Sequence, residues 1–469
     1  RIPAYYLPDG EYVVESNLDA AFEAAKKLSP GIKREELRQD DDVLDTWFSS
    51  WLWPISVFDP EKPGFPDKKP NKELAYYYPT NDLITAPEII FFWVARMVMA
   101  GTEFSGKIPF RNVYFTGIVR DKKGRKMSKS LGNSPDPIKM MEEYGADGVR
   151  VGMLLCSSAG NDILFDISQV EQGRNFANKI WNAYRLVSGW EYDASLVQSE
   201  QNKVAVEWFS NRLSKTIELI DDHFEKFRLS DSLMTVYKLF WDDFCAWYLE
   251  IIKPGFNTKI DKKSYDATMG FFDSLLKLLH PYMPFITEEL WQNLAPRREG
   301  ETIMLQLMPQ PQKWLQKMED TFEIASQAVM NIRNIRQSKG ISNKESLELY
   351  AKEPYDNSMT SVIEKLANVS SVKTLASFDS SIEGANFLVG TTEFFVPLKG
   401  LIDEEEERAK INAEIQHLTK FLAGVNAKLS NEKFVNNAPA DVVAVEQKKR
   451  SDAMQKIESL NNRLKSFEN

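Results

Sequence analysis

The sequence of 469 residues contains only 2 cysteines and 3 histidines, and this scarcity excludes several classes of protein. Cys156 and Cys245 lie far apart, so they offer neither a disulfide framework nor a four-ligand zinc module. We interpret both as small buried hydrophobic residues of a protein from the reducing cytosol. The sequence therefore predicts no protein-bound metal and a cytoplasmic location.

Long apolar runs are missing as well. No stretch of about 18 apolar residues exists, so no membrane-spanning helix is predicted. The most apolar segment, residues 89–99, contains Arg96 and is typical of a buried helix. The chain also lacks an excess of basic residues, since its formal net charge is −10. RNA is not excluded by this charge, because only the contact face of an RNA-binding protein needs to be positive.

The first residues do not predict a signal peptide, because Arg1-Ile2-Pro3 begins neither an apolar core nor a small-residue cleavage site. Since the first residue is arginine rather than methionine, we expect the sequence to begin inside a longer protein. The length is sufficient for several domains, each with a hydrophobic core of its own.

The first third of the chain alternates short apolar runs with glycine and proline. We predict strands at residues 12–14 and 113–116, and helices at residues 19–28 and 83–101. Alternation of strands with helices is typical of an α/β layer structure, so an α/β fold is predicted for residues 1–164.

Residues 165–340 have the apolar spacing of helices, which predicts an all-α bundle. Residues 341–400 contain short alternating runs and predict a small mixed connecting element. Within residues 165–340, the clearest apolar stripe along one helix face consists of Leu213, Ile217, Ile220, Phe224 and Phe227.

Residues 401–469 contain two stretches in which apolar residues recur at steps of four and three. This spacing is typical of a coiled coil, and the two stretches are separated by Asn436-Asn437-Ala438-Pro439. We therefore predict an antiparallel helical hairpin whose two apolar seams face each other. The seams comprise Ile411, Ile415, Leu418, Leu422, Val425 and Leu429 in the first stretch, and Ala453, Ile457, Leu460, Leu464 and Phe467 in the second.

The sharpest feature is a cationic loop between Gly124 and Gly132, with two lysines and two serines between them. A lysine offers a compact positive charge for phosphate oxygens, and the glycines allow the backbone to swing. A short lysine-rich string by itself is more often a solvated turn. Here Lys126-Met127-Ser128-Lys129-Ser130 matches the KMSKS motif of class I aminoacyl-tRNA synthetases letter for letter, after a predicted strand as in that family.

This resemblance implies a chemistry. In that family the amino acid carboxylate attacks the α-phosphate of ATP, which yields an aminoacyl-adenylate that then acylates the terminal ribose of tRNA. By resemblance ATP, with Mg²⁺ as its counter-ion, contacts Lys126 to Ser130, where Lys129 stabilises the transition state and Lys126 assists. The family's HIGH motif has no counterpart, because none of His223, His280 and His417 lies in an HxGH string.

Further strings resemble the valyl-tRNA synthetases in particular. Residues 42–50 read DVLDTWFSS, residues 89–97 read IIFFWVARM, and residues 175–183 are similar to the RNFxNKxWNA helix of that family. Residues 1–5 resemble the point where those chains re-enter the Rossmann domain after an inserted editing domain. The resemblance covers essentially the whole chain and implies a multidomain C-terminal part without the HIGH half and the editing domain.

The resemblance also implies four parts. Residues 1–164 would be the C-terminal half of the Rossmann catalytic domain, and residues 165–340 a helical anticodon-binding domain. Residues 341–400 would connect this domain to residues 401–469, a coiled-coil tRNA-binding arm.

Individual residues receive roles in the same way. Trp47 and Trp93 would wall the pocket for the valine side chain, because rigid aromatic faces suit a small branched apolar group. Core filling is the alternative for both. The family usually has Gly-x-Asp at the position of Ala86-Pro87-Glu88. Glu88 is therefore expected to meet the adenosine ribose with a longer side chain than the usual aspartate.

Arg333 and Arg336 are candidates for anticodon contacts, with a solvated helix face as the alternative. The implied partners are tRNA(Val), valine and ATP, without a membrane, and we expect a monomer that is inactive without the HIGH half. A non-catalytic tRNA-binding module with a vestigial loop and an isoleucyl-tRNA synthetase piece remain as alternatives. The unaltered loop string argues against the first, and Thr46 to Ser50 with the hairpin argue against the second.

Overall fold

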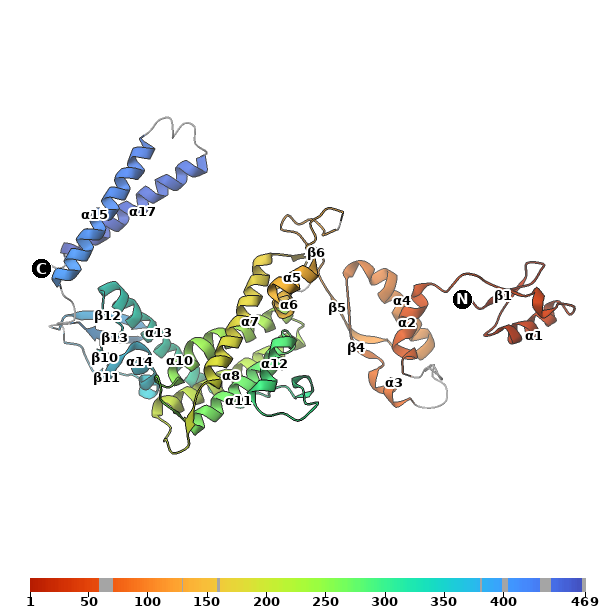
Figure 1. Ribbon diagram of the computed structural model, residues 1–469, viewed down its shortest axis with the longest axis horizontal. Coiled ribbons are helices and arrows are strands. Elements are labelled where there is room, and N and C mark those ends of the chain that lie inside the picture. Colours follow the sequence, from red (N-terminus) through yellow and green to blue (C-terminus); the bar gives the residue numbers. More distant parts are fainter. Residues whose placement is uncertain are drawn as a thin grey trace. The chain divides into compact units, whose positions relative to one another are not determined.

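The computed structural model describes residues 1–58, 71–128, 130–157, 161–379, 382–398, 404–430 and 440–465, without the side chains of 404–411, 414, 440–442, 444, 459 and 462–465. Two compact units are present, Arg1–Asn175 with Asp222–Met234, and Phe176–Asp221 with Thr235–Asn469. In Figure 1 the ribbon is coloured from red at the N-terminus to blue at the C-terminus. Lys129 and Phe467 lie outside the described residues, and so do the side chains of Ile411 and Leu464.

The first unit begins with a small antiparallel sheet in the order β2 (Tyr12–Val14), β1 (Ala4–Tyr6), β3 (Arg38–Gln39). Helix α1 (Leu18–Leu28) packs against β2 and begins where the Asn17 side chain accepts a hydrogen bond from the Ala20 amide. The strand predicted at residues 12–14 and the helix predicted at 19–28 are confirmed. The core between helix and sheet contains Tyr5, Leu7, Val13, Ala21, Ala25, Ile32 and Leu37.

A strand–helix–strand arrangement follows, preceded by α2 (Thr46–Ser56) and α3 (Lys72–Tyr77). Strands β4 (Thr80–Thr85) and β5 (Phe110–Phe115) are parallel, with α4 (Ala95–Ser105) between them in sequence. The helix predicted at 83–101 is wrong at its start, because residues 83–85 belong to β4. Ala86 is extended, as expected for a residue before proline, so helical structure begins only at Pro87.

The loop-bearing segment lies between β6 (Val119–Arg120) and β7 (Ile163–Leu164), which pair in parallel. Helices α5 (Pro137–Tyr144) and α6 (Ala146–Leu155) separate these strands, and α7 (Ile167–Ser188) follows them. Helices α6 and α7 approach closely at their glycines. A Cβ on Gly152 would lie 2.7 Å from Cα of Val170, so a larger residue would push the helices apart.

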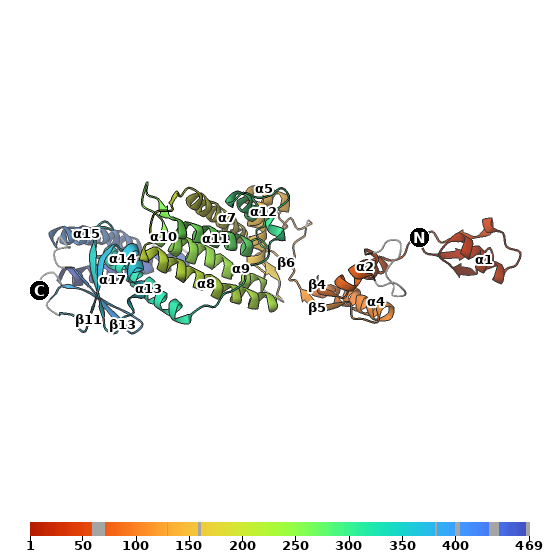
Figure 2. The same ribbon diagram turned by 90° about the horizontal axis from the view of Figure 1, so that it is seen from below.

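The second unit contains a helical bundle, in which α8 (Glu200–Glu225) and α11 (Lys262–Leu279) lie side by side (Figure 2). Leu213, Ile217 and Ile220 are buried on α8 as predicted, whereas Phe224 is 36% exposed and Phe227 lies beyond the helix end. Residues of α7 from Phe176 onward belong to this unit, and α9 (Leu229–Lys238) begins in the first unit and ends in the second. The second unit also contains a π-helical stretch (Leu239–Tyr248), α10 (Leu249–Ile252), α12 (Pro284–Leu294) and α13 (Gln316–Lys339). The short strands β8 (Tyr192–Asp193) and β9 (Ile260–Asp261) pair in parallel.

A four-stranded sheet follows the bundle in the same unit. Its order is β11 (Val369–Leu375), β10 (Leu347–Lys352), β13 (Thr392–Pro397), β12 (Gly384–Val389), and only the β10–β11 pair is parallel. The crossover between β10 and β11 contains α14 (Thr360–Ala367), which packs against both β11 and α13.

The last two helices, α15 (Glu404–Leu429) and α17 (Ala440–Lys465), lie side by side (Figure 1). Among their described side chains, the predicted seam is the less exposed face. Glu446 is also buried, which the sequence did not predict. Its carboxylate lies 2.7 Å from the Lys449 ammonium and 3.8 Å from the Lys428 ammonium of α15. The buried seam residues are Val425, Ala453 and Leu460, and the partly buried ones are Ile415, Leu418, Leu422, Leu429 and Ile457.

Candidate functional site

The candidate site is centred on the lysine-rich loop between β6 and α5. Its stem is a tight turn in which the Gly124 amide donates to the Asp121 carbonyl and the Asp121 amide donates to the Arg125 carbonyl. Gly124 has a φ of +75°, a conformation that L side chains rarely adopt. A bridge between Arg120 and Lys126 continues the stem, so the stem fixes where the motif begins.

The Asp121 carboxylate is the main acceptor of this stem, and only 14% of its side chain is exposed. Its Oδ1 accepts the amides of Lys123 at 3.0 Å and Arg125 at 2.9 Å. Its Oδ2 accepts Arg125 Nε at 2.8 Å and Asn133 Nδ2 at 3.0 Å. The Asn133 hydrogen bond, followed by the Arg125 contacts, holds the pKa of Asp121 well below its usual range, so the carboxylate is ionised at neutral pH.

The Asn133 amide joins the two ends of the loop. Its Oδ1 accepts the Ser128 amide at 3.0 Å, while its Nδ2 donates to Asp121 and, at 3.3 Å, to the Lys126 carbonyl. Ser128 Oγ in turn accepts the Leu131 amide at 3.2 Å and lies 3.0 Å from Ser130 Oγ. The described residues of the motif therefore form a closed, internally hydrogen-bonded turn.

The Lys126 side chain is well exposed. Lys126 Nζ lies 4.0 Å from Oε1 of Glu88, which belongs to the 3₁₀ turn Pro87–Ile89 just before the π-helical segment Ile90–Val94. Both groups are exposed, so the pair adds little stability. Its importance is geometric, because two residues predicted separately as ATP contacts lie beside each other.

The predicted side-chain pocket has a feature that the sequence did not reveal. The Arg96 guanidinium lies 3.4 Å from the centroid of the Trp47 ring and donates to the carbonyls of Phe91 and Phe92. One face of Trp47 is therefore covered by a cation, an arrangement typical of tryptophan and arginine. Trp93 is partly buried in the π-helical segment, and Trp47 lies on α2, which packs against α4.

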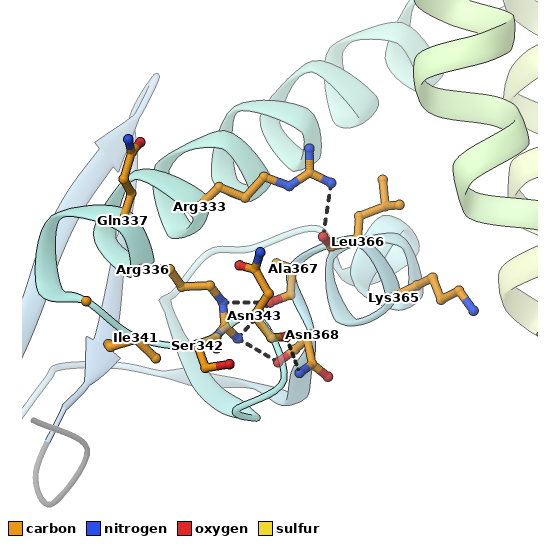
Figure 3. A pocket seen from close by; sticks show the side chains of 11 residues that line it. Arg333, Arg336, Gln337, Ile341, Ser342, Asn343, Lys365, Leu366, Ala367 and Asn368 are labelled. Carbon is orange, nitrogen blue, oxygen red and sulfur yellow. Dashed lines mark hydrogen bonds between the residues drawn. The ribbon is translucent and has the colours of Figure 1, made fainter.

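The two arginines predicted to meet the anticodon have different environments (Figure 3). Arg336 is 3% exposed, and its guanidinium donates to the carbonyls of Ser342, Ala367 and Asn368. It ties the end of α14 to α13 and has its donors directed at these carbonyls rather than at solvent. Arg333 is exposed and donates one hydrogen bond to the Leu366 carbonyl. Only Arg333 is placed so that it could meet RNA without a rearrangement of the core.

The pocket beside these arginines has a volume of about 830 Å³ and is lined mainly by the ends of α13 and α14 (Figure 3). The carbonyl groups at helix C-termini carry partial negative charge. Arg333 and Arg336 donate hydrogen bonds to such carbonyls at the end of α14. Both guanidinium groups therefore already have an acceptor within the protein.

Arg96, Asp121 and Asn133 are the residues that sequence reasoning missed around the loop and the side-chain pocket. Aspartate at the first and glycine at the fourth position of residues 121–124 is a β-turn signature, so the stem could have been predicted. The contacts of Arg96 and Asn133 depend on loop and helix geometry and carry no comparable local signal.

Within the described ranges, no helix is both long and apolar enough to cross a membrane. The same part of the chain contains no group of three or more histidine, cysteine, aspartate and glutamate side chains arranged to hold a metal ion.

Three family profiles match consecutive parts of the chain. Residues 9–166 match tRNA synthetases class I (I, L, M and V), residues 206–351 match the anticodon-binding domain of tRNA ligase, and residues 403–468 match the valyl tRNA synthetase tRNA binding arm. The three matches lie in the order in which the sequence predicted a catalytic part, a helical part and an arm.

Curated relatives extend the similarity over the whole chain. The valine–tRNA ligase of Parabacteroides distasonis is 55% identical over 462 residues, which are 98% of this chain and 52% of that protein. The valine–tRNA ligase of Phocaeicola vulgatus is 54% identical over the same shares, and that of Fusobacterium nucleatum is 41% identical over 100% of this chain and 54% of that protein. The chain thus spans about half the length of the curated relatives that it matches.

Among solved structures, LeuRS of Agrobacterium radiobacter K84, from a ternary complex with tRNA and LeuAMS, aligns with a TM-score of 0.49. The alignment has 19% identity and covers 68% of this chain and 41% of that one. At this level the likeness carries no argument about function.

Proposed function

Because this chain belongs to the valine–tRNA ligase family of class I tRNA synthetases, we propose that it supplies the lysine-bearing half of a valine-activating site. The observation that carries the proposal is the 4.0 Å approach of Lys126 to Glu88. It brings an exposed cation for phosphates beside an acceptor for a ribose hydroxyl. ATP needs both kinds of contact.

The proposed reaction has two steps. A carboxylate oxygen of valine attacks the α-phosphorus of ATP, the bond to the bridging oxygen breaks, and pyrophosphate leaves with the electron pair. A hydroxyl of the terminal tRNA ribose then attacks the carbonyl carbon of valyl-adenylate, and AMP leaves. In the first step Lys126 and Lys129 would stabilise the negative charge that builds up on the phosphate oxygens.

The other loop residues would hold these lysines at the triphosphate. The backbone of Met127 and the hydroxyls of Ser128 and Ser130 lie on the same short turn, and Ser128 and Ser130 can donate hydrogen bonds to phosphate oxygens. Mg²⁺ would arrive bound to ATP and neutralise part of its charge. Glu88 would accept a hydrogen bond from the ribose, and Trp47 and Trp93 would face the valine side chain.

We expect no valine-dependent ATP–pyrophosphate exchange from this chain alone, because it has no HIGH string. We call the completed enzyme a fusion in which this chain follows the N-terminal part of the Parabacteroides distasonis relative, up to the start of the matched region. The completed enzyme should catalyse valine-dependent ATP–pyrophosphate exchange. The natural relative, assayed in parallel, controls for the exchange assay. A folded completed enzyme that prefers isoleucine, or that exchanges with no amino acid, would contradict the proposal. The second result would favour a non-catalytic tRNA-binding module.

The second unit would bind the tRNA, as its matches to an anticodon-binding domain and a tRNA-binding arm support. Arg333 is the described candidate for an anticodon contact. Helices α15 and α17 would form a coiled-coil arm that meets the RNA backbone through its exposed lysines. We propose that the protein works as a monomer.

Leu418→Asp should separate α15 from α17, because it introduces a charge into the partly buried seam. Circular dichroism should show that the bundle stays folded. Hydrogen exchange should show that the amides of α15 and α17 lose their protection. Binding of tRNA(Val), measured by anisotropy at rising salt, should weaken and become less salt-dependent, since phosphate contacts are lost. Thr419→Asp is the matched control, because Thr419 is exposed. Equal binding by the wild type and Leu418→Asp would exclude the arm as an RNA contact.

A further inference from the structure

We propose that Asp121 and Asn133 are positioning residues for the lysine-rich loop, which they hold in one conformation before the nucleotide arrives. Together they are called here the loop clamp. The inference rests on the proposed function, since it assigns a role in the same reaction to two side chains that need not touch the substrate.

The first argument is the topology of the contacts. Asn133 bonds to three points, namely the stem at Asp121, the carbonyl of Lys126 and the amide of Ser128. One side chain therefore links the residues before, within and after the motif. Asp121 has a matching role in the stem, because one carboxylate accepts two backbone amides and the Arg125 guanidinium besides Asn133.

The second argument is the conformation of the backbone. The chain reverses at Gly124 and Gly132, which have φ values of +75° and +63°. Glycines at both ends leave the loop free to move when no side chain restrains it. The clamp spans the loop between these two glycines, so it opposes the freedom that they provide.

The third argument is electrostatic. The Asp121 carboxylate is saturated by donors, and a hydrogen bond from ionised or polar donors to a carboxylate is stronger than one between neutral groups. Asp121 also directs its negative charge at Arg125 rather than at Lys126, since Arg125 Nη2 lies 2.7 Å from its Oδ2. The Lys126 ammonium is left exposed and available for phosphate oxygens.

A loop that is ordered in advance does not have to lose conformational freedom when the transition state forms. Misplacement of a catalytic group by about 1 Å can lower the rate about 100-fold. In the completed enzyme, Asn133→Ala should therefore lower kcat for valine-dependent pyrophosphate exchange by about 10- to 100-fold. The KM for valine should be unchanged, because the clamp lies in the nucleotide loop. A structural defect in the whole domain would instead change both constants.

The reciprocal exchange Asp121→Asn with Asn133→Asp keeps an amide–carboxylate hydrogen bond between the two positions but reverses its direction. If the clamp acts through this bond, the double variant should recover about tenfold in kcat over Asn133→Ala. The proposal would be overturned if kcat of the double variant were as low as kcat of each single variant, Asp121→Asn and Asn133→Asp.

Hydrogen exchange on the chain itself gives an independent readout. Asn133→Ala should speed exchange of the Ser128 amide about fivefold, and Asp121→Ala should do the same for the Arg125 amide, because each loses its acceptor. Asn112→Ala is the matched control, since Asn112 Nδ2 donates to Asp82 Oδ1 at 2.9 Å in the same unit but outside the loop. It should leave the loop amides unchanged.

The outcomes separate this inference from the proposed function. A completed enzyme that exchanges with no amino acid contradicts the function, while the exchange rates of Ser128 and Arg125 still test the clamp. An active enzyme whose kcat is unaffected by Asn133→Ala contradicts the clamp alone. Unchanged loop amides in Asn133→Ala would also overturn it.

Discussion

Lys129→Ala should lower the rate of valine-dependent pyrophosphate exchange by the completed enzyme about 100-fold or more. In the proposed mechanism Lys129 would contact the phosphates only as charge accumulates on them, and groups of this kind contribute about 10²- to 10³-fold. The effect should fall on kcat, with the KM for valine nearly unchanged. Single-turnover formation of valyl-adenylate is the direct measurement.

Lys123→Ala is the control for this variant. Lys123 is exposed on the stem turn, so its replacement removes a positive charge close to the loop but outside the motif. We expect less than about a twofold change, because exposed charges are screened by solvent and salt. Adenylate formation at the wild-type rate in Lys129→Ala would remove this lysine from the mechanism.

Arg212→Met should destabilise the helical bundle by about 3–5 kcal/mol, the usual cost of removing one partner from a buried ion pair. The Arg212 guanidinium bridges two helical elements, with Nη1 2.7 Å from Asp243 Oδ1 and Nε 2.6 Å from Glu319 Oε2. The Glu319 side chain is 5% exposed and that of Asp243 is 17% exposed. Without the arginine, Asp243 remains a poorly solvated carboxylate. Urea unfolding followed by tryptophan fluorescence measures the change.

The same variant should show a distinct pH dependence. Burial raises the pKa of Asp243 to about 6, although Arg212 opposes the shift. A carboxyl group whose pKa is raised on folding binds its proton more tightly in the native state, so its contribution to stability increases as pH falls from about 6 towards 4. The defect of Arg212→Met should therefore be smaller at pH 5 than at pH 7, because a protonated Asp243 no longer leaves a buried charge.

Lys262→Met is the matched control, since Lys262 pairs with Asp266 at 2.6 Å on an exposed helix surface. Its loss should cost less than about 1 kcal/mol and show little pH dependence between 5 and 7. Equal unfolding midpoints for Arg212→Met and Lys262→Met would show that the buried pair contributes no more than a surface pair.

The sequence by itself determined the features that are written in consecutive residues. The motif from Lys126 to Ser130 indicated a class I aminoacyl-tRNA synthetase, in agreement with the profile match of residues 9–166, because the motif is a string of consecutive residues. The helical stripe of Leu213, Ile217 and Ile220 also needed no structure, since apolar spacing along one chain already defines a face. The strand at residues 12–14 was predictable for the same reason.

Only the tertiary structure decided what individual polar side chains do. Arg336 had the sequence features of an RNA contact, yet its guanidinium binds the carbonyl of Ala367, 31 residues away along the chain. Glu446 is charged and is nevertheless buried between α15 and α17 because lysines lie beside it. Both roles depend on segments that fold against each other, and no local pattern encodes which carbonyl or ammonium group a side chain will meet.

The loop divides in the same way between sequence and structure. Its lysines were recognisable from the residues alone, because charge and spacing are local properties. Its clamp was not, since Asn133 acquires three partners only when the glycines at 124 and 132 reverse the chain. The sequence therefore determined which groups could act on a phosphate, and the tertiary structure decided which groups hold them, because hydrogen bonds require distances and directions that exist only in the folded chain.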